Sequence, residues 1–220
     1  ASGDITTRTI RADVLTLNGF NIRQLATSDI ANDATFIATG DFTLADSARL
    51  IVNDGAIAID AASAGLDGNI SVARGEASIT TTGNIAVNGD VSAPTVILES
   101  GSNIAMSNSG VITGTASVVV DGQSGVSLTR INGGEGSVSL ISSNGAITDG
   151  NGANTNVVAN QLSIDANTGI GGSGSSALNT QVATLAANNT AGEIHIENNG
   201  DIDVLALRTN GDIDFTNVTG

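Results

Sequence analysis

The sequence repeats a short alternating pattern of apolar and small residues about every twenty positions. Triplets of this kind occupy 57–59, 77–79, 96–98, 118–120, 138–140, 162–164, 182–184 and 202–204. Their central residues are Ala58, Ser78, Ile97, Val119, Ser139, Ser163, Ala183 and Asp203, which lie 20, 19, 22, 20, 24, 20 and 20 positions apart. A fixed period of this length is typical of solenoid proteins, in which each repeat adds one turn of chain.

A second series of apolar segments interleaves with the first, at 85–87, 104–106, 126–128, 147, 170, 194–196 and 213–215. Over five successive repeats it follows the first series by eight or nine residues. Alternation places Ile85 and Val87 on one side of the chain and Ala86 on the other, as in a half-buried strand. The two series therefore predict two strands in each repeat.

Gly and Asn end these strands, as in TTGNIAV and NNGDIDV, where they supply tight turns. Strands this short cannot bury an apolar face alone, so each must stack on its equivalent about 4.8 Å away. The sequence predicts an all-β, right-handed parallel β-helix with about eleven rungs of about 20 residues. A β-sandwich would lack the strict phase, and a leucine-rich repeat would show a Leu and Asn ladder.

Domain organisation is predicted to be simple, because no linker interrupts residues 1–220. Pro occurs once, at Pro94, and Gly is spread evenly along the chain. Residues 1–40 are less regular. In particular, GFNIRQLATSDIANDATF at 19–36 breaks the phase and is interpreted as an irregular rung or a loop crossing the stack.

Composition excludes several classes of partner. The seven basic residues are all Arg, against 22 acidic residues and a formal charge of −15. Nucleic acids and anionic membrane surfaces both require basic groups, so neither is an expected partner. The chain has no Cys and no apolar run long enough for membrane insertion. Its N-terminus, ASGDITTRTI, lacks the features of a signal peptide.

Two segments resemble the repeats of filamentous-haemagglutinin-like large exoproteins, the adhesins of bacterial two-partner secretion systems. They are GDVSAPTVILESGSNIAM at 89–106 and the region 160–204. The family signature falls on Gly169, Ile170, Gly171, Leu178, Thr180, Leu185, Ala186, Ala187, Gly192 and Ile194. The resemblance implies a right-handed parallel β-helix, a place on the bacterial cell surface, and a role as the shaft of an adhesin. Its receptor, on host cells, bacterial cells or a glycan, is not identified by these residues.

The chain departs from that family in two respects. It has no counterpart of the family's N-terminal secretion domain, so we expect an internal fragment of a longer exoprotein. Where some members carry an Arg-Gly-Asp cell-binding tripeptide, this chain has Arg74-Gly75-Glu76, which is interpreted as a turn. The apolar segment 213–215 is followed by no polar cap, so we expect further rungs as neighbours or end-to-end self-association.

An enzyme on the same scaffold, a polysaccharide lyase or hydrolase, is the alternative. Such sites need clustered carboxylates with basic groups, and usually aromatic rings that stack on sugars. Asp203 and Asp214 are the candidate pair, but they fall on different faces of one rung, and the chain has no Trp or Tyr. We therefore expect solvated acids and no catalytic, cofactor-binding or metal-binding residues.

Calcium is the one cofactor that the sequence leaves open. The segment DGNGANTN at 149–156 offers hard oxygen ligands, but GGEGSVSL at 133–140 has Val138 where the calcium repeat requires Asp. His195 is expected to be a lone surface imidazole. The Thr run at 80–82 is not repeated on neighbouring rungs, and Asn and Ser in the turns are expected to form stacked ladders.

Overall fold

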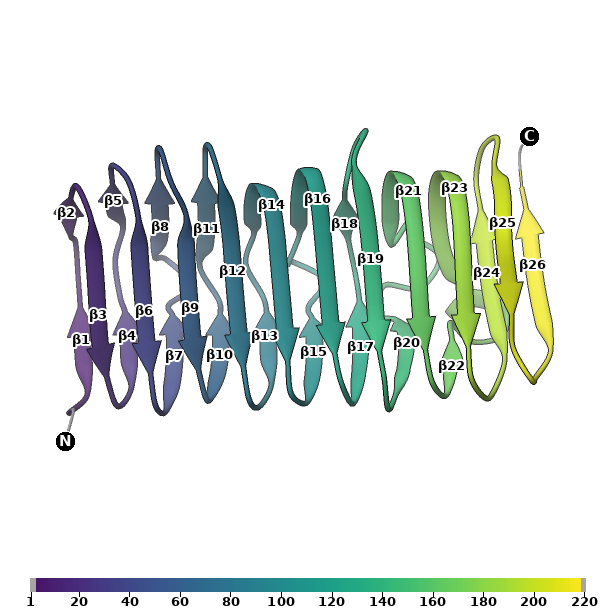
Figure 1. Ribbon diagram of the computed structural model, residues 1–220, viewed down its shortest axis with the longest axis horizontal. Helices are drawn as coiled ribbons and strands as arrows, with labels where there is room; N and C mark the ends of the chain where they lie inside the picture. Colours follow the sequence, from purple (N-terminus) through teal and green to yellow (C-terminus); the bar gives the residue numbers. More distant parts are fainter. Residues whose placement is uncertain (1–2, 219–220) are drawn as a thin grey trace.

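The computed structural model describes residues 3–218 of the chain. Within that range the chain forms a parallel β-solenoid of about ten turns, each of roughly 20 residues. In Figure 1 the chain rises on the far side and descends on the near side as it advances toward the C-terminus, which is right-handed winding. The predicted all-β parallel β-helix is therefore confirmed.

Each turn contributes strands to three sides, which we name A, B and C. Side A consists of β1 (Ile5–Thr7), β4 (Ile22–Gln24), β7 (Asp41–Leu44), β10 (Ser63–Leu66), β13 (Ile85–Val87), β15 (Asn103–Met106), β17 (Gly125–Leu128), β20 (Ala146–Asp149), β22 (Gly169–Ile170), β24 (Ile194–Asn198) and β26 (Ile213–Asn217). These are the strands of the second series in the sequence, extended to the N-terminal turns.

Side B begins with β2 (Arg11–Ala12), β5 (Ser28–Ile30), β8 (Arg49–Val52) and β11 (Asn69–Val72), and includes β18 (Ile131–Asn132). Side C includes β3 (Leu15–Gly19), β6 (Ala34–Ala38), β9 (Ile57–Ala61), β12 (Glu76–Thr81), β19 (Ser137–Ser142) and β25 (Asp203–Arg208). Four longer strands run from side B onto side C: β14 (Val91–Ser100), β16 (Ile112–Gly122), β21 (Val157–Ala166) and β23 (Leu178–Asn189).

Register keeps equivalent residues in columns along the axis. On side A, Ile85 pairs with Ala64 on one side and Ile104 on the other, and Ile104 pairs with Val126. Each inward column therefore stacks aliphatic side chains directly on aliphatic side chains. The result is a narrow core that runs from Leu15 to Ile196 without a break.

Aromatic side chains contribute to this core near the N-terminal end. Phe36 and Phe42 are fully buried, and their ring centroids lie 5.1 Å apart in an edge-to-face arrangement. Phe20 is exposed instead. Elsewhere in the described residues the apolar core consists of Ile, Val, Leu and Ala, together with Met106.

Residues 19–36 form regular rungs, so the prediction of an irregular rung or a crossing loop is wrong. Strands β4, β5 and β6 each pair in parallel with the rungs before and after them. The sequence pattern fails here because two inward positions carry Gln24 and Ser28, both fully buried. Gln24 Nε2 donates hydrogen bonds to Ser28 Oγ, at 2.9 Å, and to the Arg8 carbonyl oxygen, at 2.5 Å. The polar pair is satisfied within the core.

Two of the predicted triplets are displaced from the register of the structure. Ser163 pairs with Ala186 rather than with Ala183, because the loop before β23 lengthens this repeat. Ala186 in turn pairs with Ala206, and a register shift before it leaves Leu205 outside the ladder. The sequence also missed side B, whose strands are short or continuous with those of side C.

The turns carry polar ladders of the kind that the sequence predicted. Asn21 Nδ2 donates to Asp4 Oδ1 at 3.0 Å, and Asn21 Oδ1 accepts the Asp41 N–H at 2.9 Å. Ser63 Oγ then donates to Asp41 Oδ1 at 2.7 Å. One column of short polar side chains thus links four successive rungs and satisfies backbone groups at the turns.

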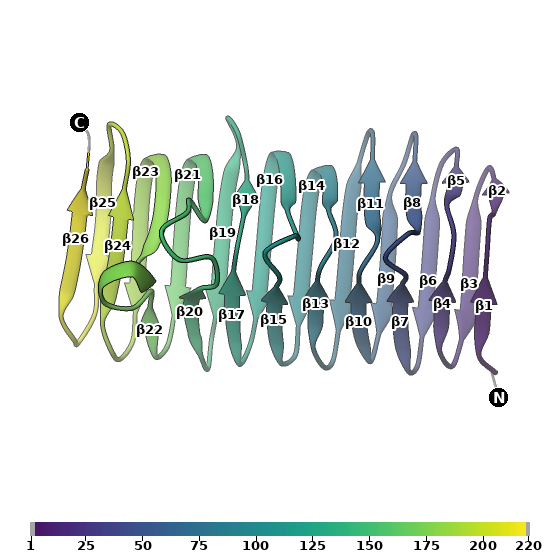
Figure 2. The same cartoon turned by 180° about the vertical axis from the view of Figure 1, so that it is seen from behind.

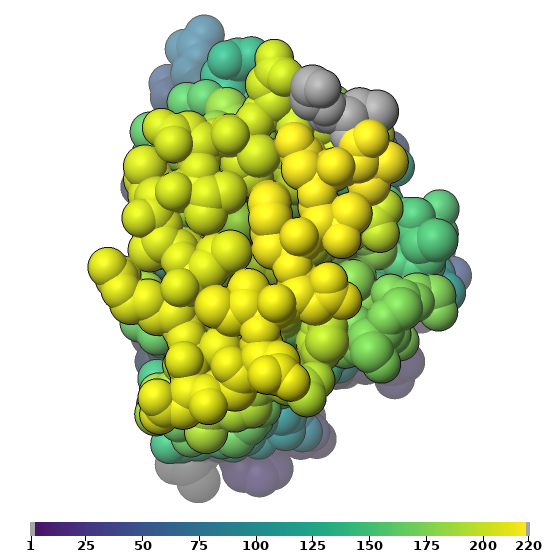
Figure 3. All heavy atoms as spheres, turned by 90° about the vertical axis from the view of Figure 1, so that its right-hand side faces the viewer, coloured from purple at the N-terminus to yellow at the C-terminus, as the bar shows by residue number. Residues whose placement is uncertain are grey.

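The last described rung leaves apolar side chains exposed at the C-terminal end of the rod, which is the end that faces the viewer in Figure 3. Ile213 is 46% exposed and Leu205 is 66% exposed, although Ile213 continues an inward column of side A. Residues 219–220 lie outside the described range, so the expectation of further rungs stays a prediction.

Candidate functional site

The loop that joins β20 to β21 extends sideways from the stack, as Figure 2 shows. Asp149 holds this loop together. Its Oδ1 accepts the Asn151 N–H and its Oδ2 accepts the Gly152 N–H, both at 2.8 Å. Asn156 Nδ2 donates to the same carboxylate at 2.7 Å. The only carboxylate in DGNGANTN therefore serves as a turn anchor.

The sequence left open whether this loop binds calcium. Three N–H groups already occupy the Asp149 carboxylate, and Asn156 also donates to Asn151 Oδ1 at 3.0 Å. Among residues 3–218, no group of three or more His, Asp and Glu side chains is placed to hold a metal ion. Binding of calcium stays a prediction, and the contacts of Asp149 do not support it.

Beside the loop lies a surface hollow of about 620 Å³. Its lining comes from turns and strands of successive rungs and consists of Asn108, Thr129, Arg130, Asn151, Asn154, Thr155, Val158 and Gln181. Amides and hydroxyls dominate this lining, together with one guanidinium and no carboxylate. We name it the Arg130 hollow. The repeat pattern did not predict this hollow, because only the stacking of rungs brings residues 108 and 181 together.

A second hollow, on side C, contains two neighbouring carboxylates. Glu99 and Asp121 are paired across β14 and β16, beside Thr80 and Gln123. Burial raises the pKa of the Asp121 carboxyl, and the charge of Glu99 adds to the effect. Asp121 Oδ1 is buried and has no hydrogen-bond partner among residues 3–218.

His195 lies on the outward side of β24, as predicted, but it is not isolated, because it lies between two carboxylates. Its Nε2 is 2.6 Å from Glu193 Oε2, and its Nδ1 is 3.5 Å from Asp214 Oδ2. The hydrogen bond with Glu193 raises the pKa of His195, and the Asp214 carboxylate also raises it, against an opposing effect of burial. Sequence register could have revealed this contact, because β24 and β26 place His195 opposite Asp214.

Asp203 and Asp214, the candidate catalytic pair, belong to different sides of the last rung, as predicted. Asp203 is exposed on side C opposite Thr184, and Asp214 is exposed on side A beside His195. The nearest basic residue in sequence, Arg208, contacts Asn188 Oδ1 from Nη1 at 3.3 Å. The structure therefore does not assemble these acids with an arginine into one site.

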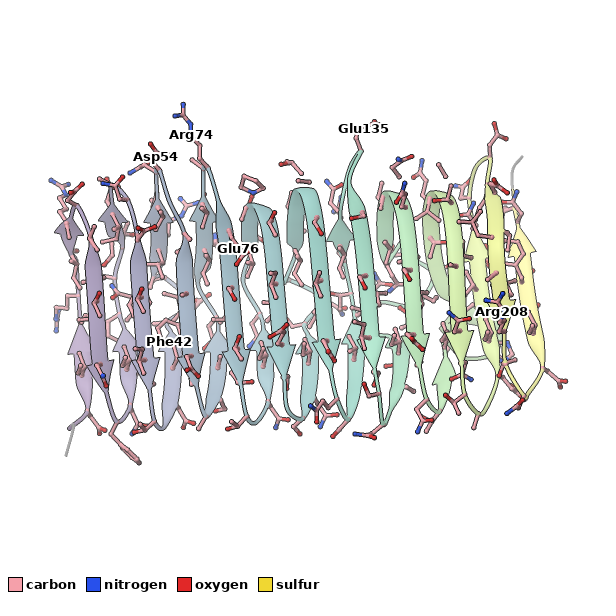
Figure 4. The ribbon with its side chains drawn as sticks, viewed as in Figure 1. Phe42, Asp54, Arg74, Glu76, Glu135 and Arg208 are labelled. Carbon is pink, nitrogen blue, oxygen red and sulfur yellow. The ribbon has the colours of Figure 1, made fainter. Side chains whose placement is uncertain are left out.

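Arg74 and Gly75 lie in the tight turn between β11 and β12, and Glu76 begins β12. Arg74 projects from the edge of the stack (Figure 4). Gly75 has φ of 121°, and a Cβ there would lie 2.1 Å from the Gly55 carbonyl oxygen. The turn interpretation is confirmed. In the Thr run, Thr81 points inward and is buried, whereas Thr80 and Thr82 are exposed, so the three hydroxyls do not form one surface.

Comparison of the chain with protein-family models, curated proteins and solved structures gives no match. Within residues 3–218, no helix has the length and apolar character needed to cross a membrane.

Proposed function

We propose that the chain is a β-helical shaft segment of a secreted bacterial cell-surface exoprotein of the filamentous-haemagglutinin-like adhesin kind. Its role is structural and adhesive. The observation that carries this proposal is the unbroken stacking of rungs in register, with a core that continues from Leu15 to Ile196. The repeats at 89–106 and 160–204, which resemble that family, supply the cell-surface context.

A rod of this design suits a spacer, because each rung adds about 4.8 Å of length without changing the cross-section. Every rung contacts only its neighbours, so rungs can be added or removed without redesigning a closed core. The net charge of −15 keeps such a rod soluble. In this architecture the number of rungs determines the length of the rod.

Deletion of one whole rung tests the spacer role. Removing residues 118–137 joins Ser117 to Val138, and because Ser117 pairs with Ser137 the remaining strands keep their register. We expect a folded rod that is shorter by about 4.8 Å, measured by small-angle scattering and circular dichroism. Removing 118–127 alone is the control. It takes out half a rung, brings strands of different sides together, and is expected to unfold the neighbouring rungs.

Function is tested by placing the whole-rung series between an outer-membrane anchor and a terminal epitope on a bacterial surface. Adhesion and antibody access are expected to fall as rungs are removed. Adhesion that does not change with rung number would contradict the shaft role. Release of reducing ends or unsaturated products from acidic polysaccharides, abolished by Asp203→Asn or Asp214→Asn, would favour the enzyme instead.

A further inference from the structure

The Arg130 hollow differs in charge from other hollows of the molecule. Four others each include at least one Asp or Glu and no basic residue, among them the Glu99 and Asp121 hollow and one lined by Glu197 and Asp214. The Arg130 hollow has the opposite character, with one guanidinium and no acid. On a protein with a net charge of −15, the charge of this hollow is the one that suits an anion.

The Arg130 guanidinium is free to meet such an anion. Arg130 is exposed, and its side chain has no hydrogen bond or ion pair with any residue in the range 3–218. Its neighbours in the stacking column are Val111 and Asn156, neither of which carries a charge. A guanidinium with open donors binds a planar carboxylate through two parallel hydrogen bonds.

The rest of the lining is suited to sugar hydroxyls. Asn151 donates to the Thr129 carbonyl oxygen, and Asn154 Nδ2 donates to the Asn151 carbonyl oxygen at 2.9 Å, so the loop amides are held in place. The side chains of Asn108, Thr155 and Gln181 line the hollow without a hydrogen bond inside the described chain. Amides and hydroxyls both donate and accept, as sugar hydroxyls require of their partners.

We propose that the Arg130 hollow binds an oligosaccharide that carries a carboxylate, a uronic-acid chain. Arg130 pairs with the carboxylate, while Asn108, Thr155 and Gln181 contact ring hydroxyls. The volume of about 620 Å³ lies within the usual range for small-ligand sites. The lining has no Asp, Glu or His to act as an acid or base, so the site binds its sugar without cleaving it.

The test uses the intact chain and a galacturonic acid trisaccharide, with binding followed by NMR titration. Arg130→Gln is expected to weaken binding at least tenfold. Arg49→Gln is the matched control, because Arg49 is exposed in the same column, four rungs earlier, and outside the hollow. It removes the same charge and is expected to leave binding unchanged. Gln181→Ala is expected to weaken binding severalfold without any change in net charge.

Ligand variants separate the carboxylate from the sugar. The trisaccharide with its carboxyls reduced to hydroxymethyl groups is expected to bind at least tenfold more weakly. Equal binding of that neutral sugar, equal binding of a sulfated trisaccharide, or equal losses with Arg130→Gln and Arg49→Gln would each overturn the proposal. Absence of any shift at millimolar trisaccharide would do so too. These outcomes are independent of the rung deletions, so the shaft role and this site fail or stand separately.

Discussion

Glu99 in β14 lies directly opposite Asp121 in β16, so that two carboxylates occupy neighbouring positions in one outward column of side C. Thr80 precedes them in this column and Ile141 follows. No basic residue stands next to either acid in the column. Burial and the charge of Glu99 together raise the pKa of the Asp121 carboxyl.

Asp121→Asn is expected to stabilise the protein at pH 7 by up to about 1 kcal/mol. Because the folded pKa of Asp121 is raised, its ionisation costs stability as pH rises from the unfolded pKa through the folded one. The gain should therefore disappear below the unfolded pKa, where both states are protonated. Urea unfolding at neutral and acidic pH measures it. Asp165→Asn, between Ile141 and Asn188 in the same column, should have little effect.

His195 is expected to titrate above its ordinary pKa of about 6.5. Because the pKa is raised in the folded state, protonation of His195 stabilises that state. The contribution is complete below the ordinary pKa and is lost as pH rises through the folded-state pKa. Since the chain has one His, an NMR titration reports on this side chain alone. Glu193→Gln should lower the pKa more than Asp214→Asn does. A midpoint at or below the ordinary value would contradict the observed contacts.

Ile85→Asp is expected to cost about 3–5 kcal/mol of unfolding free energy. Ile85 is 1% exposed in the core, so the variant buries a charge without a partner. Ala86→Asp, at the next position of β13 but on the outward side, should cost less than about 1 kcal/mol. Denaturant unfolding of the two variants provides the comparison. Similar losses at both positions would show that the register is misassigned.

Gly75→Ala is expected to cost more than about 2 kcal/mol. The backbone of Gly75 is left-handed, and its missing Cβ leaves room for the Gly55 carbonyl oxygen of the previous rung. Gly65→Ala is the control, because a Cβ there meets no atom within 4 Å. Thermal unfolding of both variants should separate a turn that depends on glycine from a strand position that tolerates alanine.

Self-association is expected to increase with salt. The exposed Ile213 and Leu205 at the C-terminal end can stack on the first rung of a second copy. Asp201, Asp203, Asp212 and Asp214 repel at low ionic strength, and salt screens that repulsion. Sedimentation across a salt series measures the association. A monomer at high protein concentration and high salt would contradict it.

The sequence predicted those parts of the structure in which inward positions are aliphatic. Ile85, Ile104 and Val126 recur with the period of the rung, so their strands could be predicted without any tertiary information. Where Gln24 and Ser28 satisfy each other inside the core, the apolar pattern vanishes although the rung persists. An apolar pattern identifies inward positions only where they carry apolar side chains. It misses inward positions at which two polar side chains hydrogen-bond to each other, as Gln24 and Ser28 do.

Surface sites were harder to predict than the core. The contact between His195 and Asp214 follows from the register of 194–196 on 213–215, which the second series supplies. The Arg130 hollow also depends on the loop between β20 and β21, whose shape the repeat pattern does not predict. Ser163, for example, was predicted to align with Ala183 but pairs with Ala186. A few extra residues in one loop are therefore enough to shift the predicted register.

Parallel stacking also determines how the molecule responds to tension. Strands run across the rod, so the hydrogen bonds between rungs lie along its length. A force applied to the two ends loads the outermost ladder first, and the rungs peel away one after another. Each released rung of about 20 residues supplies roughly 70 Å of extended chain in place of about 5 Å of rod. The rod would lengthen in steps under load and dissipate a sudden pull while its remaining rungs stay folded.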